Sequence, residues 1–328
     1  MNTALRIATY TAALAATFGA AYGVGSVVTP VSTDPESTAP PHTKHAGASD
    51  GEGEAPGSGQ DAPAGGLRIS EGGYTLDLGT PRVPAARTTE LRFAIRDSAG
   101  RQVTAFQREH DKELHLILAS QDLTTYRHLH PTRAADGTWS TPANLPVAGG
   151  YRLFADFTPA AEGAKNLTLG ADLAVAGDYR PAPVPAPSAT ATVDGYTVTL
   201  TGPLRPGTAG ELNLRVSKAG RPVTDLDPYL GAYGHLVALR SGDLAYLHVH
   251  PNGEPGDGKT EPGPDVSFTA TAPSAGTYRL FLDFKHNGTV RTAAFTVTAA
   301  TAPGSGNPGG GGPASSPAEG EADGGHGH

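Results

Sequence analysis

One histidine-containing motif occurs twice in the sequence, as YRHLHP and, 120 residues later, as YLHVHP. Histidine accounts for only 12 of the 328 residues, so a repeated pair points to metal chemistry. Alternate residues of a β-strand face the same side, about 6–7 Å apart along the chain. His128 and His130 are therefore expected to share one face, and so are His248 and His250. Two such imidazoles can bind one ion at metal–nitrogen distances of about 2.0–2.1 Å.

A third histidine recurs at matched spacing upstream of each pair. His115 and His235 each lie thirteen residues before the first histidine of their pair, and the turn sequences SQDL and SGDL lie between. This pattern predicts an antiparallel hairpin that brings the third imidazole to the other two. The sequence thus predicts a three-histidine site in each repeat, the two sites lying in separate domains. His110 adds a fourth histidine to the first site, whereas the second repeat has Leu230 there.

Acidic residues near these histidines are further candidates. Asp156 and Asp283 occupy the same place in two F-x-D-F segments, where they would act as carboxylate ligands, as partners of the ligands or as structural residues. Glu109, Asp111 and Glu113 lie close to His110 in the first repeat and are weaker candidates.

The ligand types restrict the metal. The chain has no cysteine and a single methionine, at position 1, which excludes blue-copper sites and sites selective for Cu(I). Imidazole ligands suit Cu(II), Zn(II) or Ni(II), and Cu(II) has the highest place in the affinity order. We expect Cu(II) or Zn(II) as the bound ion.

The elements that position these residues are predicted to be short strands. The 44 glycines and 29 prolines are too many for a helical protein, and they separate runs rich in Val, Thr, Leu, Tyr and Phe. Long segments of the chain also match each other in order and spacing, for example GGYRLFADF and GTYRLFLDF. We predict an all-β protein of two tandem immunoglobulin-like or cupredoxin-like β-sandwiches. Their predicted limits are 67–177 and 189–298, joined by a linker at 178–188.

The flanking segments indicate export. Residues 1–30 hold one early cation and a long apolar run, as expected of a signal peptide or a membrane anchor. Residues 31–66 have a composition typical of a disordered linker, and residues 299–328 that of a disordered tail containing histidine. The net charge of −8 argues against a nucleic-acid partner. The predicted location is extracytoplasmic, either anchored to the membrane through the N-terminal segment or secreted.

The segments REHDKELHLILASQDLTTYRHLHP and PYLGAYGHLVALRSGDLAYLHVHP resemble the signature of a family of exported actinobacterial proteins. Members of that family carry this pair of repeats behind an N-terminal hydrophobic segment, and some relatives are associated with heavy-metal and copper handling. The resemblance covers residues 67–298 and implies exported metal handling. The architecture is also similar to that of small periplasmic copper carriers with an immunoglobulin-like fold, an analogy of fold alone.

Three functions follow from these observations. The first is a metal-binding protein that holds Cu(II) or Zn(II) for resistance or delivery, with a membrane metal transporter as a possible partner. The second is a metalloenzyme, because three histidines and an open position can activate water. Glu109 or Glu113 would then be the base, and the second repeat has no acid in the matching segment 231–233. The third is a structural or adhesive stalk with incidental histidines.

Overall fold

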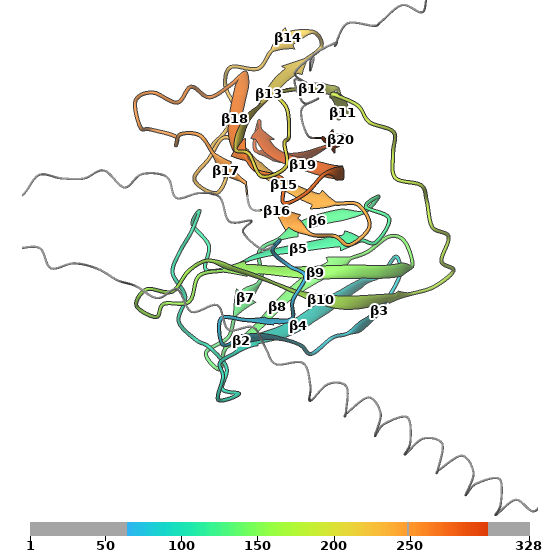
Figure 1. Cartoon of the computed structure of the whole chain (residues 1–328), viewed down its shortest axis with the longest axis vertical. Coiled ribbons are helices and arrows are strands. Elements are labelled where there is room, and N and C mark those ends of the chain that lie inside the picture. Colours follow the sequence, from blue (N-terminus) through green and yellow to red (C-terminus); the bar gives the residue numbers. More distant parts are fainter. Residues whose placement is uncertain (1–63, 248, 301–328) are drawn as a thin grey trace, which may run out of the picture. The chain divides into compact units, whose positions relative to one another are not determined.

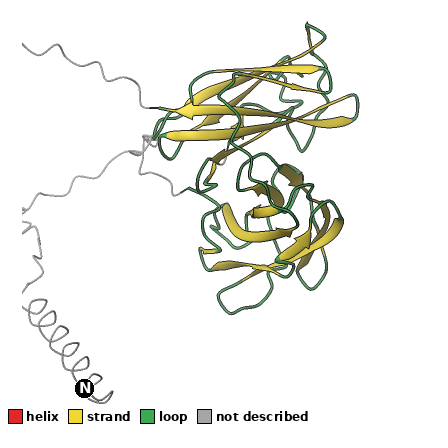
Figure 2. Ribbon diagram, turned by 90° about the vertical axis from the view of Figure 1, so that its right-hand side faces the viewer, coloured by secondary structure: helices red, strands yellow, loops and turns green. Residues whose placement is uncertain are grey.

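The computed structural model describes residues 64–247 and 249–300. The predicted N-terminal segment, most of the predicted linker that follows it and nearly all of the predicted tail lie outside these residues. Within the described residues, no helix has the length and apolar character needed to cross a bilayer. Figure 2 shows strands and loops only in this part of the chain.

The described residues form ten strands in each repeat, including strands of only two residues. Figure 1 shows the first repeat in blue and green and the second in yellow to red. The strands of the first repeat are β1 (Ser70–Glu71), β2 (Tyr74–Leu78), β3 (Arg82–Pro84), β4 (Thr88–Arg96), β5 (His115–Ser120), β6 (Tyr126–Leu129), β7 (Thr132–Arg133), β8 (Thr138–Asn144), β9 (Gly149–Phe157) and β10 (Leu167–Ala176). The strands of the second repeat are β11 (Thr190–Val193), β12 (Tyr196–Thr201), β13 (Gly210–Lys218), β14 (Arg221–Pro222), β15 (His235–Arg240), β16 (Tyr246–Leu247), β17 (His250–Pro251), β18 (Asp265–Ala270), β19 (Gly276–His286) and β20 (Thr289–Ala299). The prediction of an all-β protein is confirmed.

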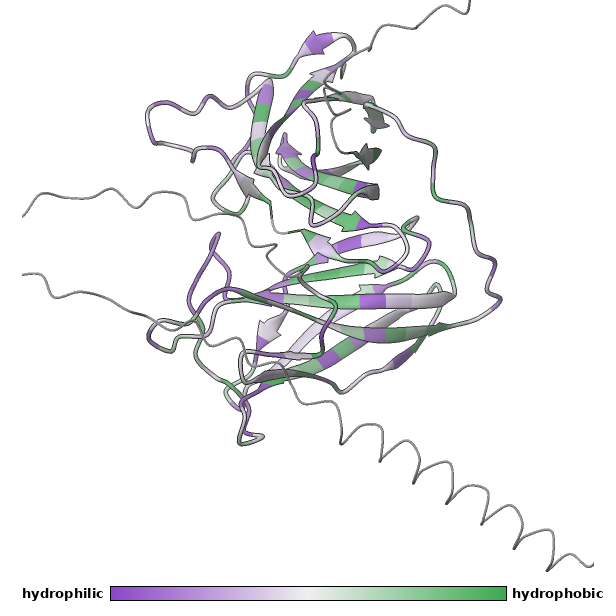
Figure 3. Cartoon of the chain, viewed as in Figure 1, coloured by the Kyte–Doolittle hydropathy of each residue, from purple (hydrophilic) through white to green (hydrophobic). Residues whose placement is uncertain are grey.

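Each repeat folds as two separate sheets. In the first repeat the strand orders are β1-β2-β4-β8-β7 and β3-β10-β9-β5-β6. In the second repeat they are β11-β12-β13-β18-β17, with β14 also paired to β13, and β16-β15-β19-β20. Neighbouring strands are antiparallel except for β3 and β10, which are parallel. Several strands carry hydrophobic bands interrupted by hydrophilic ones, and many loop residues are hydrophilic (Figure 3).

The two sheets of each repeat enclose an apolar core, to which the strands contribute alternate residues. In β4, Leu91, Phe93 and Ile95 are buried in the core of the first repeat, together with Leu116 and Leu118 of β5. Because side chains alternate between faces, the intervening residues of β5 point away from that core. They are also buried, which explains why β5 is a nearly continuous apolar run.

A third apolar cluster joins the two repeats and accounts for that second buried face. It combines Ile117, Ala119, Leu123, Tyr126 and Phe154 of the first repeat with Val237, Leu239, Leu244, Tyr246 and Phe281 of the second. Tyr126 stacks on Phe281 with ring centroids 4.2 Å apart, and the matching pair, Phe154 and Tyr246, lies 5.5 Å apart. Equivalent faces of the two repeats thus pack against each other in a reciprocal way.

The start of the described chain also joins both repeats. Gly65 and Tyr246 exchange two backbone hydrogen bonds, of 3.2 and 3.0 Å, and the N–H of Gly66 donates to the carbonyl of Thr168. Gly65 and Gly66, which belong to the predicted linker 31–66, are therefore held by backbone hydrogen bonds.

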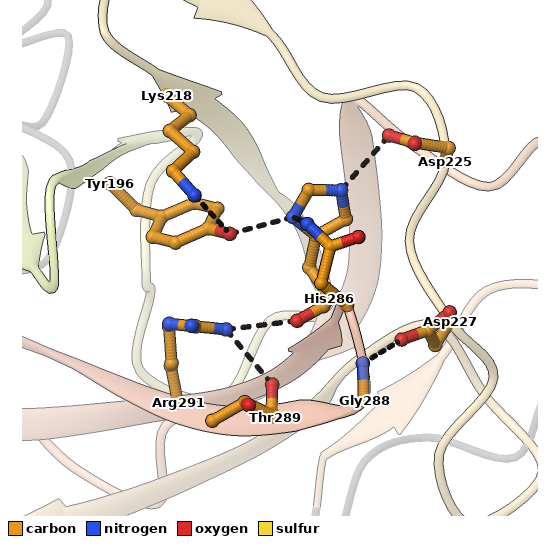
Figure 4. Close-up of polar contacts among 9 residues, drawn as sticks. Tyr196, Lys218, Asp225, Asp227, His286, Gly288, Thr289 and Arg291 are labelled. Carbon is orange, nitrogen blue, oxygen red and sulfur yellow. Dashed lines mark hydrogen bonds and ion pairs between the residues drawn. The ribbon is translucent and has the colours of Figure 1, made fainter.

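The second repeat contains a polar network that the first repeat lacks at the matching positions (Figure 4). The Tyr196 hydroxyl donates to Nδ1 of His286 at 2.6 Å, and Nε2 of His286 donates to Asp225 at 3.1 Å. Nζ of Lys218 donates to the same hydroxyl at 3.3 Å. Pro159 stands where the second repeat has His286. This histidine is therefore satisfied by local partners and is a structural residue of its own repeat.

The His-x-His-Pro segments lie where the chain passes from one sheet to the other. β6 ends at Leu129, and after Pro131 the chain enters β7 of the opposite sheet. In the second repeat β16 and β17 make the same transition, with Pro251 closing β17. A proline cannot donate to a strand ladder, and the two prolines accordingly lie outside a strand, as Pro131 does, or at the end of one, as Pro251 does in β17.

Candidate metal centre

Three histidines of the first repeat converge at this transition. His115 opens β5 and His128 lies on β6, and the predicted hairpin forms with Ile117 opposite His128. The third is His130. Each of the three histidines offers one ligand atom, and these atoms lie within 4.8 Å of one another. The ring centroids are 4.8 to 5.7 Å apart. Imidazoles that share a tetrahedral ion at 2.0–2.1 Å have centroids about 5 Å apart, so the three rings lie close to a ligating arrangement.

Hydrogen bonds on the far sides of two rings fix where their lone pairs lie. Nε2 of His115 lies 3.3 Å from the carbonyl of Glu109, which can only accept, so the neutral ring has its lone pair on Nδ1. Nδ1 of His128 lies 2.8 Å from Oδ2 of Asp283, and an ionised carboxylate also only accepts. A neutral His128 ring that donates to Asp283 therefore has its lone pair on Nε2.

These two lone pairs face each other across 3.1 Å, the distance between Nδ1 of His115 and Nε2 of His128. Neutral rings in these tautomers have no proton to share at that contact. A cation bound to both nitrogens removes the repulsion, and a 3.1 Å separation corresponds to about 100° between two ligands at 2.0–2.1 Å from one ion.

The third ring has a buried nitrogen that nothing satisfies. Nε2 of His130 has no hydrogen-bond partner among the described residues. Buried polar atoms are rarely left without a partner, and an unplaced ion is one of the standard explanations. The three residues thus fit an imidazole-bound divalent ion.

Burial favours the neutral form, which ligation requires, in His115, His130 and His235. Burial, with a smaller contribution from neighbouring His128, lowers the pKa of His115 to about 4. Burial likewise lowers the pKa of His130 to about 4. The pKa of His235 also falls to about 4 through burial, although its hydrogen bond to the Tyr229 carbonyl opposes the shift. At neutral pH these three rings hold their lone pairs without competition from protons.

His235, from the second repeat, lies beside the histidines of the first. Its ring centroid is 6.3 Å from those of His115 and His128 and 5.2 Å from that of His110. Nε2 of His235 donates to the carbonyl of Tyr229 at 2.8 Å, which repeats the contact of His115 with its own turn. His235 belongs to the second repeat, and the docked repeats bring it beside the first set, a proximity that the sequence did not predict. Its grouping with His248 and His250 stays a prediction.

His110 reaches this place through a tight turn. It has φ of +49° and is followed by Asp111 at +64°, and backbone hydrogen bonds between Glu109 and Lys112 close the turn. The matching turn of the second repeat has Leu230 and Gly231 in the same left-handed conformation. The side chain of His110 is thereby set against His235 rather than within the group of three.

A small cavity of about 40 Å³ lies among these histidines. Its lining comes from both repeats and consists of His110, His115, Ile117, His128, Asp156, His235, Leu236, Val237, Tyr246 and Val249. Pockets for organic ligands measure about 300–1,000 Å³, whereas a single water occupies about 30 Å³. The cavity is therefore far smaller than a typical pocket for an organic ligand and has room for an ion with a water.

The remaining histidines of the prediction are not placed. His248 lies outside the described residues, and only the backbone of His250 is described. A metal site at His248 and His250 stays a prediction from sequence.

The acidic candidates divide into two groups. Asp283 accepts from His128, and Asp156, 5% exposed, accepts from Asn166 at 2.7 Å. The carboxylate of Glu109 instead accepts from the Thr158 hydroxyl, and that of Glu113 pairs with Arg133 at 3.1 Å. Both glutamates proposed as bases are thus engaged away from the three rings. Sequence reasoning identified Asp283 as a candidate and missed that its partner lies in the other repeat.

Acidification is expected to destabilise the metal-free protein between about pH 6.5 and pH 4. The folded chain holds His115, His130 and His235 with pKa values of about 4, and unfolded histidine titrates near pH 6.5. Between these values the unfolded chain binds more protons, so the free energy of unfolding falls as the pH falls and this contribution levels off below pH 4. Urea unfolding at pH 7, 5.5 and 4.5 measures it.

The control for this pH effect is His115→Gln, which removes one of the three titrating rings. Its unfolding free energy should depend less steeply on pH in the same window, whereas the titration of carboxyl groups is common to both proteins. Equal slopes for the two proteins would contradict a neutral, buried His115.

Comparisons with known proteins agree with the repeat organisation. A family model described as "Domain of unknown function (DUF8832)" matches residues 69–176 and again residues 191–301. A search of curated proteins found no match. The matched segments lie close to the limits predicted from the sequence for the two repeats.

Solved structures with similar folds include β-domain proteins of bacterial surfaces. FdeC, an Escherichia coli adhesin, is 18% identical, with 71% of this chain and 65% of that chain covered and a TM-score of 0.22. Invasin, a bacterial integrin-binding protein, is 12% identical, with 71% and 41% covered and a TM-score of 0.21. A tetra-tandem repeat from the extending region of a large adhesion protein is 15% identical, with 69% and 49% covered and a TM-score of 0.23.

This chain spans less than two thirds of each of these structures, and the likeness concerns β-sandwich architecture alone. The family match is of a different kind, since it covers well over half of the chain and finds the same domain in both repeats. The chain belongs to the DUF8832 family, whose domain it carries twice.

Proposed function

We propose that this protein is an exported metal-binding protein that holds Cu(II) or Zn(II) at His115, His128 and His130. The observation that carries the proposal is the 3.1 Å approach of Nδ1 of His115 to Nε2 of His128, the two nitrogens that their other hydrogen bonds leave free to bind an ion. His130 adds a buried nitrogen without a partner among the described residues. Three imidazoles are a ligand set that both ions accept.

Binding for resistance or delivery is favoured over catalysis. The adjoining cavity of about 40 Å³ has no room for an organic substrate, and the carboxylates of Glu109 and Glu113 are turned to other partners. A bound ion would have room for a water as its fourth ligand. A ligand atom of an acceptor protein could replace this water when the ion is handed over. A membrane metal transporter is the partner that this role would require.

The N-terminal sequence supports the exported location. One cation and a long apolar run in residues 1–30 are what a signal peptide or membrane anchor requires. The low histidine pKa values suit a site outside the cytoplasm, because such a site would keep its neutral ligands in mildly acidic surroundings.

Metal titration of residues 64–300, expressed without a purification tag that binds metal, tests the proposal. The change His248→Ala with His250→Ala isolates the first repeat's site, and we expect one Cu(II) or one Zn(II) per chain by calorimetry and by metal analysis after dialysis. Binding no tighter than that of free imidazole would contradict the proposal and would favour a structural or adhesive role.

A further inference from the structure

The carboxylate that faces His128 comes from the other repeat. Asp283 lies on β19, 155 residues along the chain, and its Oδ2 is 2.8 Å from Nδ1 of His128. Both side chains are almost fully buried, with exposed fractions of 6% for His128 and 3% for Asp283. Oδ1 of Asp283 accepts from the hydroxyl of Thr292 at 2.5 Å, so both carboxylate oxygens are held in place.

This contact determines which nitrogen of His128 is available to an ion. A carboxylate that accepts from one ring nitrogen fixes the tautomer and the orientation of a ligating histidine and makes its other nitrogen a better ligand. Without Asp283, His128 would be free to carry its proton on Nε2, and this N–H would then point at Nδ1 of His115. That tautomer satisfies the two rings mutually and closes the site to a metal.

An apolar contact between the same two strands holds this pair together. Tyr126 precedes His128 by two residues on β6, and Phe281 precedes Asp283 by two residues on β19. Residues two apart on a strand share a face. The stack of Tyr126 on Phe281, at 4.2 Å, and the contact of His128 with Asp283 are therefore successive contacts of one interface.

We propose that Asp283 is a positioning residue for the metal site, so that the site is complete only when the two repeats are docked. This inference rests on the proposed function, because it assigns a role in the same site. The first repeat supplies the ligands, and the second supplies the group that orients one of them. By linkage, an ion that binds the docked state better also strengthens docking by the same factor.

Zn(II) titration of the full chain with Asp283→Asn tests the positioning role. The background carries His248→Ala and His250→Ala, so that the predicted site of the second repeat does not contribute. Asparagine keeps the size and one acceptor oxygen but loses the charge, and we expect Zn(II) to bind about 10–100-fold more weakly, the usual cost of losing such a partner. The control is Asp265→Asn, which removes an exposed carboxylate of the same repeat and should leave Zn(II) affinity unchanged.

A readout of the ring itself separates positioning from a general effect on folding. The ¹⁵N chemical shifts of His128 in the metal-free chain should report a proton on Nδ1, and in Asp283→Asn a mixture of tautomers or a proton on Nε2. If Asp283→Asn fails to fold, hydrogen exchange of the parent chain with and without Zn(II) replaces it. Zn(II) should then slow exchange in β19, which supplies none of the three ligands.

The outcomes distinguish this inference from the proposed function. If the parent chain binds no Zn(II), the proposed function itself fails. If the parent binds and Asp283→Asn binds equally well, with the proton still on Nδ1, the metal site stands and the positioning role is overturned. Exchange slowed by Zn(II) only in β5 and β6 would likewise overturn the coupling between repeats.

Discussion

Replacing His115 and His130 together by alanine is expected to abolish tight binding of Cu(II) and Zn(II) at the first repeat's site. One imidazole, His128, then remains of the three ligand atoms that lie within 4.8 Å of one another. The loss should exceed the about 10–100-fold effect of removing a partner behind a ligand, because two metal–nitrogen bonds are lost. Calorimetric titration with each ion measures it.

The choice of these two residues protects the fold. His128 stays, so the buried carboxylate of Asp283 keeps its partner and no uncompensated charge is created. The matched control is the double change His326→Ala and His328→Ala in the C-terminal tail, which removes two histidines and should leave the tight site intact. If the tail variant loses the tight binding and the His115/His130 variant keeps it, the site is assigned to the wrong histidines.

Replacing Phe281 by alanine is expected to lower the free energy of unfolding by about 3–5 kcal/mol, the usual cost of deleting a buried phenylalanine ring. Phe281 is 3% exposed and packs between the repeats, where its ring stacks on Tyr126 with an interplanar angle of 5°. The loss therefore combines apolar burial, a cavity and the stacked contact. Chemical unfolding at neutral pH, without metal, measures it.

Phe281→Leu is the control for this prediction. Leucine keeps much of the buried apolar volume and loses the aromatic contact, which contributes about 0.5–1.5 kcal/mol, so its effect should be clearly smaller. The equivalent change Phe154→Ala should cost a similar amount, because that ring packs on Tyr246 in the same cluster. A loss below about 1 kcal/mol for Phe281→Ala would show that the two repeats do not bury this face, since buried rings cost more.

The strand pattern and the first histidine group were predictable because both depend on local sequence. Alternation of apolar residues predicts β4, and the turn before Tyr126 predicts the hairpin that places His128 beside the strand opened by His115. Strand geometry then puts His128 and His130 together. Each of these inferences uses residues less than twenty positions apart.

The contribution of the second repeat depends on contacts between distant segments and was not predictable in this way. Residues 115–120 and 235–240 form apolar runs that indicate strands buried on both faces. Such a strand needs a second apolar surface against its outer face, but the sequence does not show which part of the chain provides it. The structure shows that the outer faces of these two strands pack in one apolar cluster between the repeats. Docking brings His235 near His110 and sets Asp283 behind His128.

The reciprocal packing of equivalent faces has a consequence for how this chain can vary. Two identical subunits that associate through the same patch on each form a closed twofold pair, and any change in one subunit appears in both. Here the two halves of the pair are covalently linked copies, so each half can change alone. Repeat-specific residues already use this freedom. His110 stands where the second repeat has Leu230, and among the described residues the Tyr196–His286–Asp225 network exists in one half only. A duplication that joins such a pair in one chain thus permits a feature that occurs in one half only, which a homodimer of identical chains would build twice.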